Sequence, residues 1–415
     1  MKNFILYFLF SLICAVSIAQ PKPGDVFREY IWLPDMVAEE EHFLRVGGRF
    51  DYKIYVDHFP PEGHKDGHIP LGLDLDLVEA IKAELVLEKV QSHEDTKCLL
   101  VQINDKEWLP VPDAPGIPEP QSAYMHHYYP IVDIPLEYFN HGIDNTIKLK
   151  VDPEQKWDWP QNIFYGLVFR IYYKATKIEQ RTEVVFKESA DELQLEIISE
   201  GDLKKINRVE YIGLYTDYNY EGDGVFHQWH YHYHKGKVIN HIGNGAGSTF
   251  SYFWDLSWLP DQENQIEIGA RVVYQDGFIY FLKSEKPYIM PSRHFKVALY
   301  ETYDIPENFV TREDSFNTHF DIENNLKKAV AWQISWVSWS PGYANGIYVN
   351  NIEILDHEGP KYVYYVHLHQ FDNIGILKSG QNTVATGKTP LYDGKMVHGM
   401  EVQWPGMMIK VKYKK

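Results

Sequence analysis

Hydrophobic and polar residues alternate along much of the chain with a period of two, which is typical of β-strands. The clearest alternation covers residues 145–152 (NTIKLKVD) and 192–199 (ELQLEIIS). Longer apolar runs at residues 163–174 and 329–340 indicate strands in the core of a sandwich. Glycine, proline and asparagine turns separate these runs, and helical periodicity is best at Leu77–Glu84. The pattern predicts an all-β protein built from stacked β-sandwiches.

The N-terminus, MKNFILYFLFSLICAVSIAQ, has the features of a secretory signal peptide. A lysine at position 2 precedes an apolar run at residues 4–16, and a cleavage site with small residues ends at Ala19. We expect residues 1–19 to be removed and the protein to be exported to the periplasm, or alternatively to the extracellular space, with no membrane insertion. A lipoprotein anchored through Cys14 is disfavoured, because Ile13 stands where a small residue is needed.

Two segments divide the rest of the chain into three parts. Residues 174–192 are rich in charge, and residues 284–295 contain two prolines. Each of the three parts has the ordinary size of a domain. The predicted domains are residues 20–175, 176–290 and 291–415.

The first and third parts share a short pattern, in which a strand ends in an asparagine turn and a later turn offers glycine shortly before Asn-Thr. It occurs at residues 101–108 and 141–151, and again at 347–355 and 378–388. The pattern resembles the galactose-binding-like jelly roll of many carbohydrate-active proteins. The middle part, through residues 253–281, resembles an immunoglobulin or fibronectin type III sandwich. These resemblances imply two jelly rolls flanking an immunoglobulin-like domain.

Composition narrows the class of ligand. The net charge of −18 argues against nucleic acid and anionic membranes as partners. Aromatic residues make up 15% of the chain, with 11 Trp and 30 Tyr, and such side chains stack on sugar rings. The alternative is that these aromatics only pack the sandwiches. Without its signal peptide the chain keeps one cysteine, Cys98, which we expect to be buried and unreactive.

The densest titratable stretch is FHQWHYHYHKG, at residues 226–236. On a strand, Gln228, His230, His232 and His234 share one face, and mostly aromatic side chains share the other. We expect His230 and His232 to face a cleft, one as proton carrier and the other as its orienter or as a substrate contact.

Two His-x-His pairs leave metal binding open. His230-x-His232 and His367-x-His369 have a spacing that presents two imidazoles to one metal from a single strand. Neither segment contains Asp or Glu, so a third ligand has to come from elsewhere. The sequence therefore leaves the cofactor unknown.

Other histidine, tyrosine and arginine residues add candidates for the same cleft. Residues 123–130 (AYMHHYYP) form one such cluster, residues 58–68 include His58, His64 and His68, and a late turn holds His398 and Glu401 beside a tryptophan. The alternative is that most of the 19 histidines are simply solvated. The catalytic candidates are His230, His232, His127 and Tyr129, and the substrate-binding candidates are Arg293, Trp404, Trp339 and Gln228.

The inventory favours β-elimination on uronic acids. Glycosidases need two facing carboxylates, which the sequence does not single out, and it has no Gly-x-Ser-x-Gly elbow. Elimination needs a base, an acid and a cation that neutralises the carboxylate. Candidates for the cation are Arg28, Arg45, Arg49, Arg170 and Arg293.

An exported, acidic, all-β chain with this inventory is similar to the dehydratases and accessory lyases of marine bacterial polysaccharide-utilisation systems, in particular those acting on ulvan oligosaccharides. The resemblance implies removal of water from a terminal glucuronate or iduronate. A non-catalytic carbohydrate-binding protein is the main alternative, and a structural protein without sugar affinity is the third. The oligomeric state stays open.

Overall fold

The computed structural model describes most of the chain after the predicted signal peptide. The described residues are 21–34, 43–47, 50–55, 68–92, 97–151, 162–189, 191–356, 359, 363–389 and 399–415. The predicted signal peptide and the candidates Arg49, His58, His64 and His398 lie outside them. Within the described ranges, no helix has the length and apolar character needed to cross a membrane.

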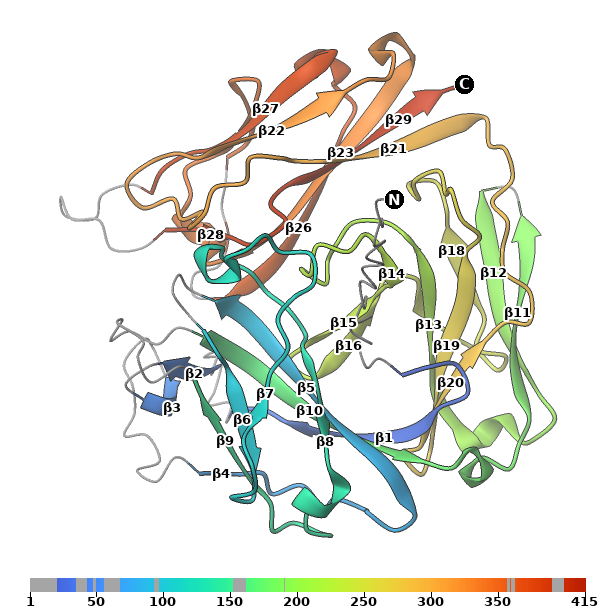
Figure 1. Ribbon diagram of the computed structural model, residues 1–415. Helices are drawn as coiled ribbons and strands as arrows, with labels where there is room; N and C mark the ends of the chain where they lie inside the picture. The colour runs from blue at the N-terminus through green and yellow to red at the C-terminus, as the bar shows by residue number, and fades with distance from the viewer. Residues whose placement is uncertain are drawn as a thin grey trace, which may run out of the picture.

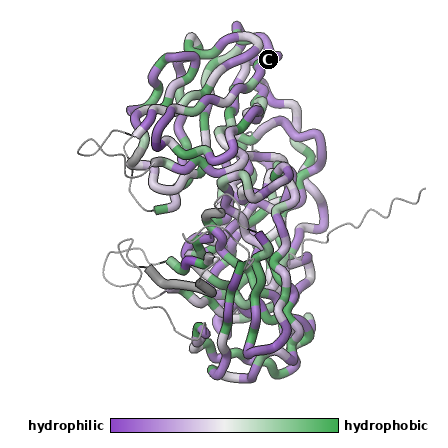
Figure 2. Tube along the Cα trace, turned by 60° about the vertical axis from the view of Figure 1, so that its left-hand side comes forward, coloured by the Kyte–Doolittle hydropathy of each residue, from purple (hydrophilic) through white to green (hydrophobic). Residues whose placement is uncertain are grey.

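The prediction of an all-β protein is confirmed: regular structure in the described residues consists of strands and short 3₁₀ turns. Hydrophobic and hydrophilic residues alternate along much of the trace (Figure 2). The 3₁₀ turns are η1 (Gln121–Ala123), η2 (Leu136–Tyr138), η3 (Ala175–Lys177), η4 (Leu203–Lys205), η5 (Leu326–Lys328), η6 (Pro341–Tyr343) and η7 (Ile374–Ile376).

A large antiparallel sheet runs through the lower half of the molecule as drawn in Figure 1. It contains strands from both the first and the second predicted domains, because β1 pairs with β10 on one side and with β20 on the other. The division at residue 175 therefore falls between strands of one sheet, and the domain boundaries stay a prediction. The eleven strands are β1 (Val26–Trp32), β2 (Phe43–Gly47), β3 (Phe50–Tyr55), β5 (Ala80–Ser92), β8 (Ile131–Ile134), β10 (Asn162–Tyr173), β13 (Ile206–Thr216), β14 (His227–Trp229), β17 (Gly243–Asn244), β19 (Glu267–Tyr274) and β20 (Ile279–Lys283).

Two smaller sheets cover one face of the large sheet and share its main apolar core. The first consists of β4 (Ile69–Pro70), β6 (Leu100–Ile103), β7 (Leu109–Pro110) and β9 (Thr146–Lys150). The second consists of β11 (Thr182–Ser189), β12 (Glu192–Ser199) and β18 (Tyr252–Asp255). The alternation at residues 192–199 predicted β12 correctly, since Leu193, Leu195 and Ile197 point into this core.

Two local expectations were wrong. The helical periodicity at Leu77–Glu84 did not produce a helix, because from Ala80 onward the chain pairs with β10 and β8 as part of β5. Pairing on both sides outweighs a weak local preference. Cys98 is exposed rather than buried; it lies in the segment just before β6, with φ of 47°.

The other face of the large sheet carries a row of buried charges. Glu84, Arg170 and Glu29 stand opposite one another on β5, β10 and β1. Arg170 donates to both carboxylates, at 2.9 Å and 3.2 Å. Arg271 on β19 bridges Glu29 and Glu210, at 2.6 Å each. We call these five residues the charge ladder; it connects the strands of the first and second predicted domains.

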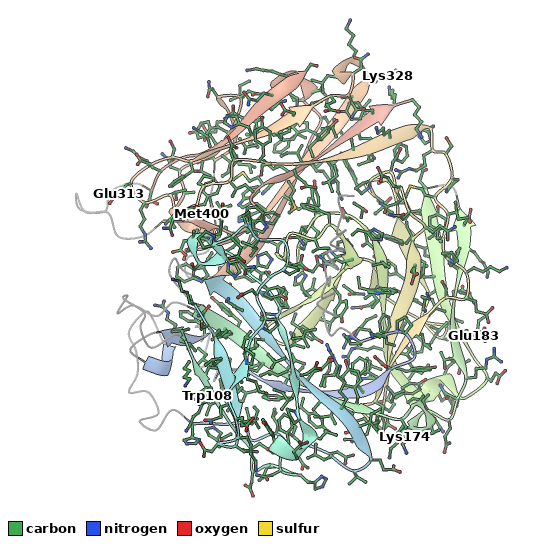
Figure 3. The ribbon with its side chains drawn as sticks, in the orientation of Figure 1. Trp108, Lys174, Glu183, Glu313, Lys328 and Met400 are labelled. Atoms are coloured by element: carbon green, nitrogen blue, oxygen red, sulfur yellow. The ribbon has the colours of Figure 1, made fainter. Side chains whose placement is uncertain are left out.

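The C-terminal sandwich packs its own core between two sheets and lies at the top of Figure 1. One sheet contains β21 (Phe295–Glu301), β23 (Ala329–Trp339), β26 (Tyr364–Phe371), β28 (Glu401–Val402) and β29 (Met408–Lys414). The other contains β22 (Asn317–Ile322), β24 (Ile347–Val349), β25 (Ile352–Leu355) and β27 (Gly380–Thr386). Figure 3 shows Met400 at the edge of this sandwich that faces the N-terminal strands. An apolar cluster that includes Tyr165 and Trp339 joins the sandwich to the large sheet.

The pattern shared by the outer parts of the sequence has a structural basis. Asn104 donates to the side-chain oxygen of Asn145 at 2.8 Å, and Asn350 donates to that of Asn382 at the same distance. In each pair the first asparagine also accepts from the backbone N–H that follows the second, and it also donates to the last carbonyl of a 3₁₀ turn, η2 or η7. The two outer parts therefore close the same turn with the same bonds.

Candidate functional site

The histidine-rich stretch leaves the large sheet at His230 and forms a separate hairpin. Strand β14 pairs with β13 and ends at Trp229, and β15 (Tyr231–His234) pairs with β16 (Lys237–Asn240). The hairpin lies in the centre of Figure 1. Its two faces differ as predicted, because Tyr231 and Tyr233 pack toward the large sheet while His232 and His234 line a pocket.

A loop at residues 217–226 completes the site. It is closed by a backbone hydrogen bond from Asp217 to Phe226 and is held inside by Asn219, which bonds Asp223 at 2.7 Å. Gly116 from the first part of the chain bonds the carbonyl of Asp223, and Asn219 contacts the sulfur of Met408 on β29. All three predicted domains therefore meet at this loop.

Glu221, at the tip of the loop, meets two imidazoles in what we call the histidine cluster: Glu221, His232 and His241. Nδ1 of His232 lies 3.3 Å from Nε2 of His241, which in turn lies 3.3 Å from a carboxylate oxygen of Glu221. One nitrogen or oxygen from each residue falls within 4.8 Å of the others. Nitrogen and carboxylate oxygen donors of this kind bind transition metals.

His230 holds the cluster from behind. Its ring is fully buried, with Nδ1 3.3 Å from both oxygens of Glu221 and Nε2 3.0 Å from the carbonyl of Tyr215. Burial by itself lowers the pKa of His230, but the charges of Glu221 and Asp217 outweigh it and raise the pKa. The expectation that His230 faces the cleft is wrong, because the loop covers it. His230 orients Glu221 instead.

The two histidines of the cluster, His232 and His241, are neutral bases. Burial, helped by His127 and other imidazoles, lowers the pKa of His232 to about 3. Burial also holds the pKa of His241 well below its usual value. Burial raises the pKa of Glu221, and His230 offsets part of that change. At neutral pH the cluster therefore presents unprotonated ring nitrogens.

A pocket of about 440 Å³ opens in front of the cluster, between the hairpin and β26. Its rim is apolar although exposed: Ile239, Tyr365 and Leu368 keep 43%, 48% and 52% of their surface accessible. Such a rim suits the C–H face of a sugar ring. The pocket is lined by Tyr220, His232, His234, Ile239, His241, Tyr364, Tyr365, Val366 and Leu368.

A second pocket of about 260 Å³ adjoins the first, and both are lined by Tyr220, His241 and Leu368. Trp254 and Trp258 supply aromatic surface to the second pocket, together with Lys410, which is paired with Asp217. Two joined pockets with aromatic walls offer room for more than one sugar unit.

The other predicted catalytic residues lie beside the cluster. The ring of Tyr129 stacks on that of His232 at 5.5 Å, and its hydroxyl lies 2.9 Å from that of Tyr364. His127 is buried, with Nε2 2.8 Å from the carbonyl of Tyr220. The structure thus brings together all four catalytic candidates, although their roles stay predictions.

Three of the substrate-binding candidates do not line the pocket, and the fourth supports the loop. Arg293 donates to the carbonyls of Leu256 and Leu259. Trp339 is buried in the cluster that joins the C-terminal sandwich to the large sheet. Trp404 packs edge-on against Tyr124, away from the pocket lining. Gln228 is buried and donates to the carbonyl of Val225 and to Asp223 in the loop.

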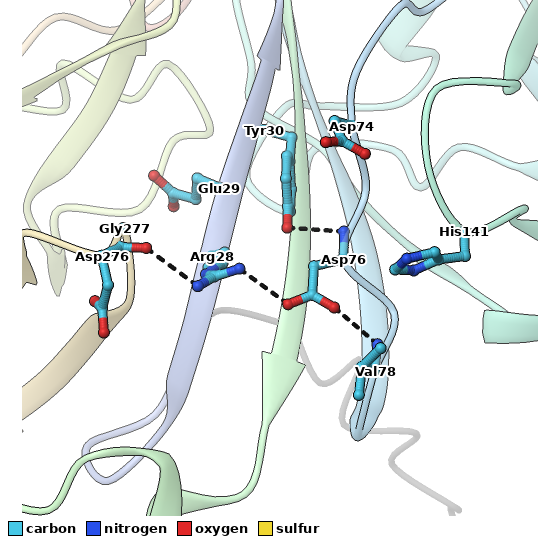
Figure 4. Close-up of a pocket in the computed structure, with 9 residues that line it drawn as sticks. All are labelled: Arg28, Glu29, Tyr30, Asp74, Asp76, Val78, His141, Asp276 and Gly277. Carbon is cyan, nitrogen blue, oxygen red and sulfur yellow. Dashed lines mark hydrogen bonds and ion pairs between the residues drawn. The ribbon is translucent and has the colours of Figure 1, made fainter.

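Two of the proposed arginine clamps are used elsewhere. Arg170 belongs to the charge ladder, and Arg28 forms an ion pair with Asp76 at 3.0 Å. Arg28 lies in a larger surface hollow of about 540 Å³, shown in Figure 4. There it also bonds the carbonyl of Asp276, while Asp76 accepts from the backbone of Val78. These groups pair with one another, so we do not place the site there.

The second His-x-His pair has different surroundings. His367 is buried, its ring stacks on Trp336 at 4.2 Å, and its Nε2 lies 2.9 Å from Oγ of Ser338. His369 is half-buried on the same strand, β26. Within the described residues, neither belongs to a group of three metal-ligand side chains.

Sequence reasoning missed Glu221, His241 and Tyr364. Glu221 sits in NYEGDG, whose glycines signal a tight loop, and Gly222 has φ of 72° with no room for a side chain against His127. His241 follows His232 by nine residues, which is a hairpin return. The glycine-rich loop points to Glu221 and the hairpin return points to His241, which are the two cluster residues that sequence reasoning missed.

No protein-family model matches the chain, and neither does any curated protein. Among solved structures it is similar to a β-porphyranase of glycoside hydrolase family 86 from the gut bacterium Bacteroides plebeius, with 12% identity and a TM-score of 0.23 over 56% of this chain and 37% of that one. It is also similar to a β-glucuronidase from Ruminococcus gnavus in complex with D-glucuronic acid, with 11% identity and a TM-score of 0.24 over 66% and 47%. The match spans less than half the length of either enzyme. Both act on carbohydrates, but likeness at this level carries no argument about this chain.

Proposed function

We propose that the protein is an exported carbohydrate-active enzyme that eliminates water, or a sugar, from uronate-containing oligosaccharides such as those of ulvan. The observation that carries the proposal is the composition of the pocket wall. Among its described residues, imidazoles and phenols surround the histidine cluster, beneath an exposed apolar rim. Such side chains suit proton transfer next to a sugar, and the joined aromatic pockets suit an oligosaccharide.

Elimination needs a base for the C5 proton. His234 lines the pocket beside Tyr364, with ring centroids 5.6 Å apart. Burial, with Lys235 and Lys237 nearby, lowers the pKa of His234, so its ring is neutral and accepts a proton at neutral pH. We assign the base to His234, and the histidine cluster to the side of the substrate carboxylate.

The departing oxygen needs a proton. Burial raises the pKa of Tyr364, which keeps its hydroxyl protonated next to that of Tyr129. In the reaction the C5–H electrons form the C4=C5 double bond, the C4–O bond breaks, and the oxygen leaves as water or as a sugar hydroxyl with the proton of Tyr364. The proton taken by His234 returns to the phenol through solvent.

The test is a panel of uronate-containing algal oligosaccharides, followed by mass spectrometry and by ultraviolet absorbance of the new double bond. Loss of one water, or cleavage with an unsaturated end, supports the proposal. Retention of sugars in affinity electrophoresis without any product contradicts it and favours a binding protein. His234→Ala should lower turnover by about 10²–10⁴-fold. The matched control is His294→Ala, because His294 is exposed and does not line the pocket.

A further inference from the structure

We propose that Glu221, His232 and His241 bind one divalent transition metal ion of the zinc class, with an open coordination position toward the pocket. Two observations carry this inference: the spacing of the donor atoms and the hydrogen bonds and ring contacts that hold the ligands in place. Binding is inferred independently of the reaction, whereas the role of the ion rests on the proposed function.

Two of the three donor-atom spacings fit tetrahedral coordination, and the third pair, His232 and Glu221, lies within 4.8 Å. Zinc ligands lie about 2.0–2.1 Å from the ion, so two ligands at the tetrahedral angle lie about 3.3–3.4 Å apart. The nitrogens of His232 and His241 are 3.3 Å apart, and the second nitrogen is 3.3 Å from the oxygen of Glu221. Two histidines with one glutamate is a donor set of catalytic zinc sites, where three protein ligands leave the fourth position open.

The support of the ligands fits as well. Metal-binding carboxylates are held by a further hydrogen bond, and His230 is within 3.3 Å of both oxygens of Glu221. His230 is itself anchored to the carbonyl of Tyr215, and Tyr129 stacks on His232.

The ion would face the substrate. His232 and His241 both line the larger pocket, and His241 also lines the smaller one. There a divalent ion would hold a uronate carboxylate and neutralise the charge that develops when C5 loses its proton. This supplies the cation that none of the predicted arginines among the described residues brings to the pocket.

The experiment measures metal on the full-length mature protein without sugar. Protein stripped with a chelator is titrated with Zn²⁺ and with Co²⁺, and bound metal is counted by elemental mass spectrometry. We expect about one ion per chain and the visible spectrum of four-coordinate cobalt. His241→Ala and Glu221→Gln should each weaken zinc binding by more than about 100-fold, and His369→Ala should leave it unchanged.

The conservative Glu221→Gln variant guards against loss of folding, which circular dichroism checks for every variant. Wild-type protein that takes up no zinc, or folded His241→Ala and Glu221→Gln variants that bind zinc as wild type does, would overturn the inference. Dehydration by metal-free protein would overturn the role of the ion and keep the proposed function, while zinc uptake by the stripped protein decides the binding site separately. Zinc binding by a protein that does not change oligosaccharides would keep the inferred metal site and remove the proposed function.

Discussion

The two faces of β15 contact two buried sets of polar side chains, the charge ladder and the histidine cluster, which differ in how their charges are paired. On one face Tyr233 donates to Glu29 and accepts from Arg170, which ties the hairpin to the charge ladder. On the other face His232 belongs to the histidine cluster and opens onto a pocket. Carboxylates and guanidinium groups alternate along the ladder, whereas burial leaves the two cluster imidazoles neutral.

The difference separates a structural network from a chemical one. In the charge ladder burial raises the pKa of Glu29, but Arg271 and Arg170 outweigh it, so the pKa is lowered. In the histidine cluster burial prevails and the pKa of Glu221 is raised. A buried carboxylate whose charge is only partly compensated is a group that a ligand can stabilise.

The largest expected effect is on activity. His232→Ala should lower turnover by about 10²–10⁴-fold, because it removes a group at the reacting centre. The free energy of unfolding should fall by only about 1–3 kcal/mol, the usual cost of disturbing one buried hydrogen-bonding group. Steady-state kinetics and urea denaturation of the same variant measure both. A His232→Ala variant with a large loss of unfolding free energy and nearly unchanged turnover would contradict the distinction between the two faces.

Glu29→Gln should show the opposite behaviour. Removing the charge leaves Arg170 and Arg271 buried with one partner fewer, which should lower the free energy of unfolding by about 3–5 kcal/mol. Zinc binding per folded chain should stay at the wild-type level, since Glu29 does not belong to the cluster. Urea denaturation measures the loss, with the exposed Glu263→Gln as the matched control.

His230→Gln tests the support of the cluster. His230 lines neither of the two pockets at the cluster, so its loss should leave one metal ion per chain but weaken zinc binding by about 10–100-fold, as for other residues that orient a ligand. The cobalt spectrum should shift as Glu221 reorients. An unchanged affinity and spectrum would mean that His230 only fills space.

Acid should weaken the charge ladder only below about pH 4.5, after the buried neutral histidines of the cluster have begun to lose stability below their usual pKa of 6.5. The lowered pKa of Glu29 means that its stabilisation is complete above about pH 4.5 and is lost as the pH falls through the lower folded-state value. The difference in unfolding free energy between wild type and Glu29→Gln should therefore shrink below about pH 4.5, by at most about 1.4 kcal/mol per pH unit. Denaturation series between neutral and acidic pH measure it. A difference that grows on acidification would contradict the sign.

The smallest effect is expected at the second His-x-His pair. His369→Ala should change the free energy of unfolding by no more than about 0.5 kcal/mol and leave turnover unchanged, because His369 is half-buried and belongs to no cluster among the described residues. Steady-state kinetics of His369→Ala and His232→Ala, measured side by side, compares the two His-x-His pairs, which have the same spacing but different surroundings. Equal losses in both variants would refute the choice of site.

Local patterns predicted the strands well because period-two alternation follows directly from which side of a strand is buried. Residues 192–199 became β12, and the repeated asparagine turns became matching networks at Asn104 and Asn350. In the stretch at residues 226–236, His232 lines the pocket, while its catalytic role stays a prediction.

The rest of the site depended on contacts between distant segments. Glu221 reaches His232 only because a loop folds back over β14, and Tyr364 arrives from another sandwich more than a hundred residues later. No local period encodes such convergence. The same limit explains the arginines: Arg170 looked available for a substrate, but its partners Glu29 and Glu84 are on neighbouring strands.

The charge ladder also limits how this molecule can be divided or recombined. A fragment ending near residue 175 would keep Glu84, Arg170 and Glu29 but lose Arg271. It would also expose the edge of β1 that β20 normally covers, and unpaired strand edges promote aggregation. In a fusion protein or a domain exchange, the segment from β1 to β20 should therefore be kept together as one folding unit.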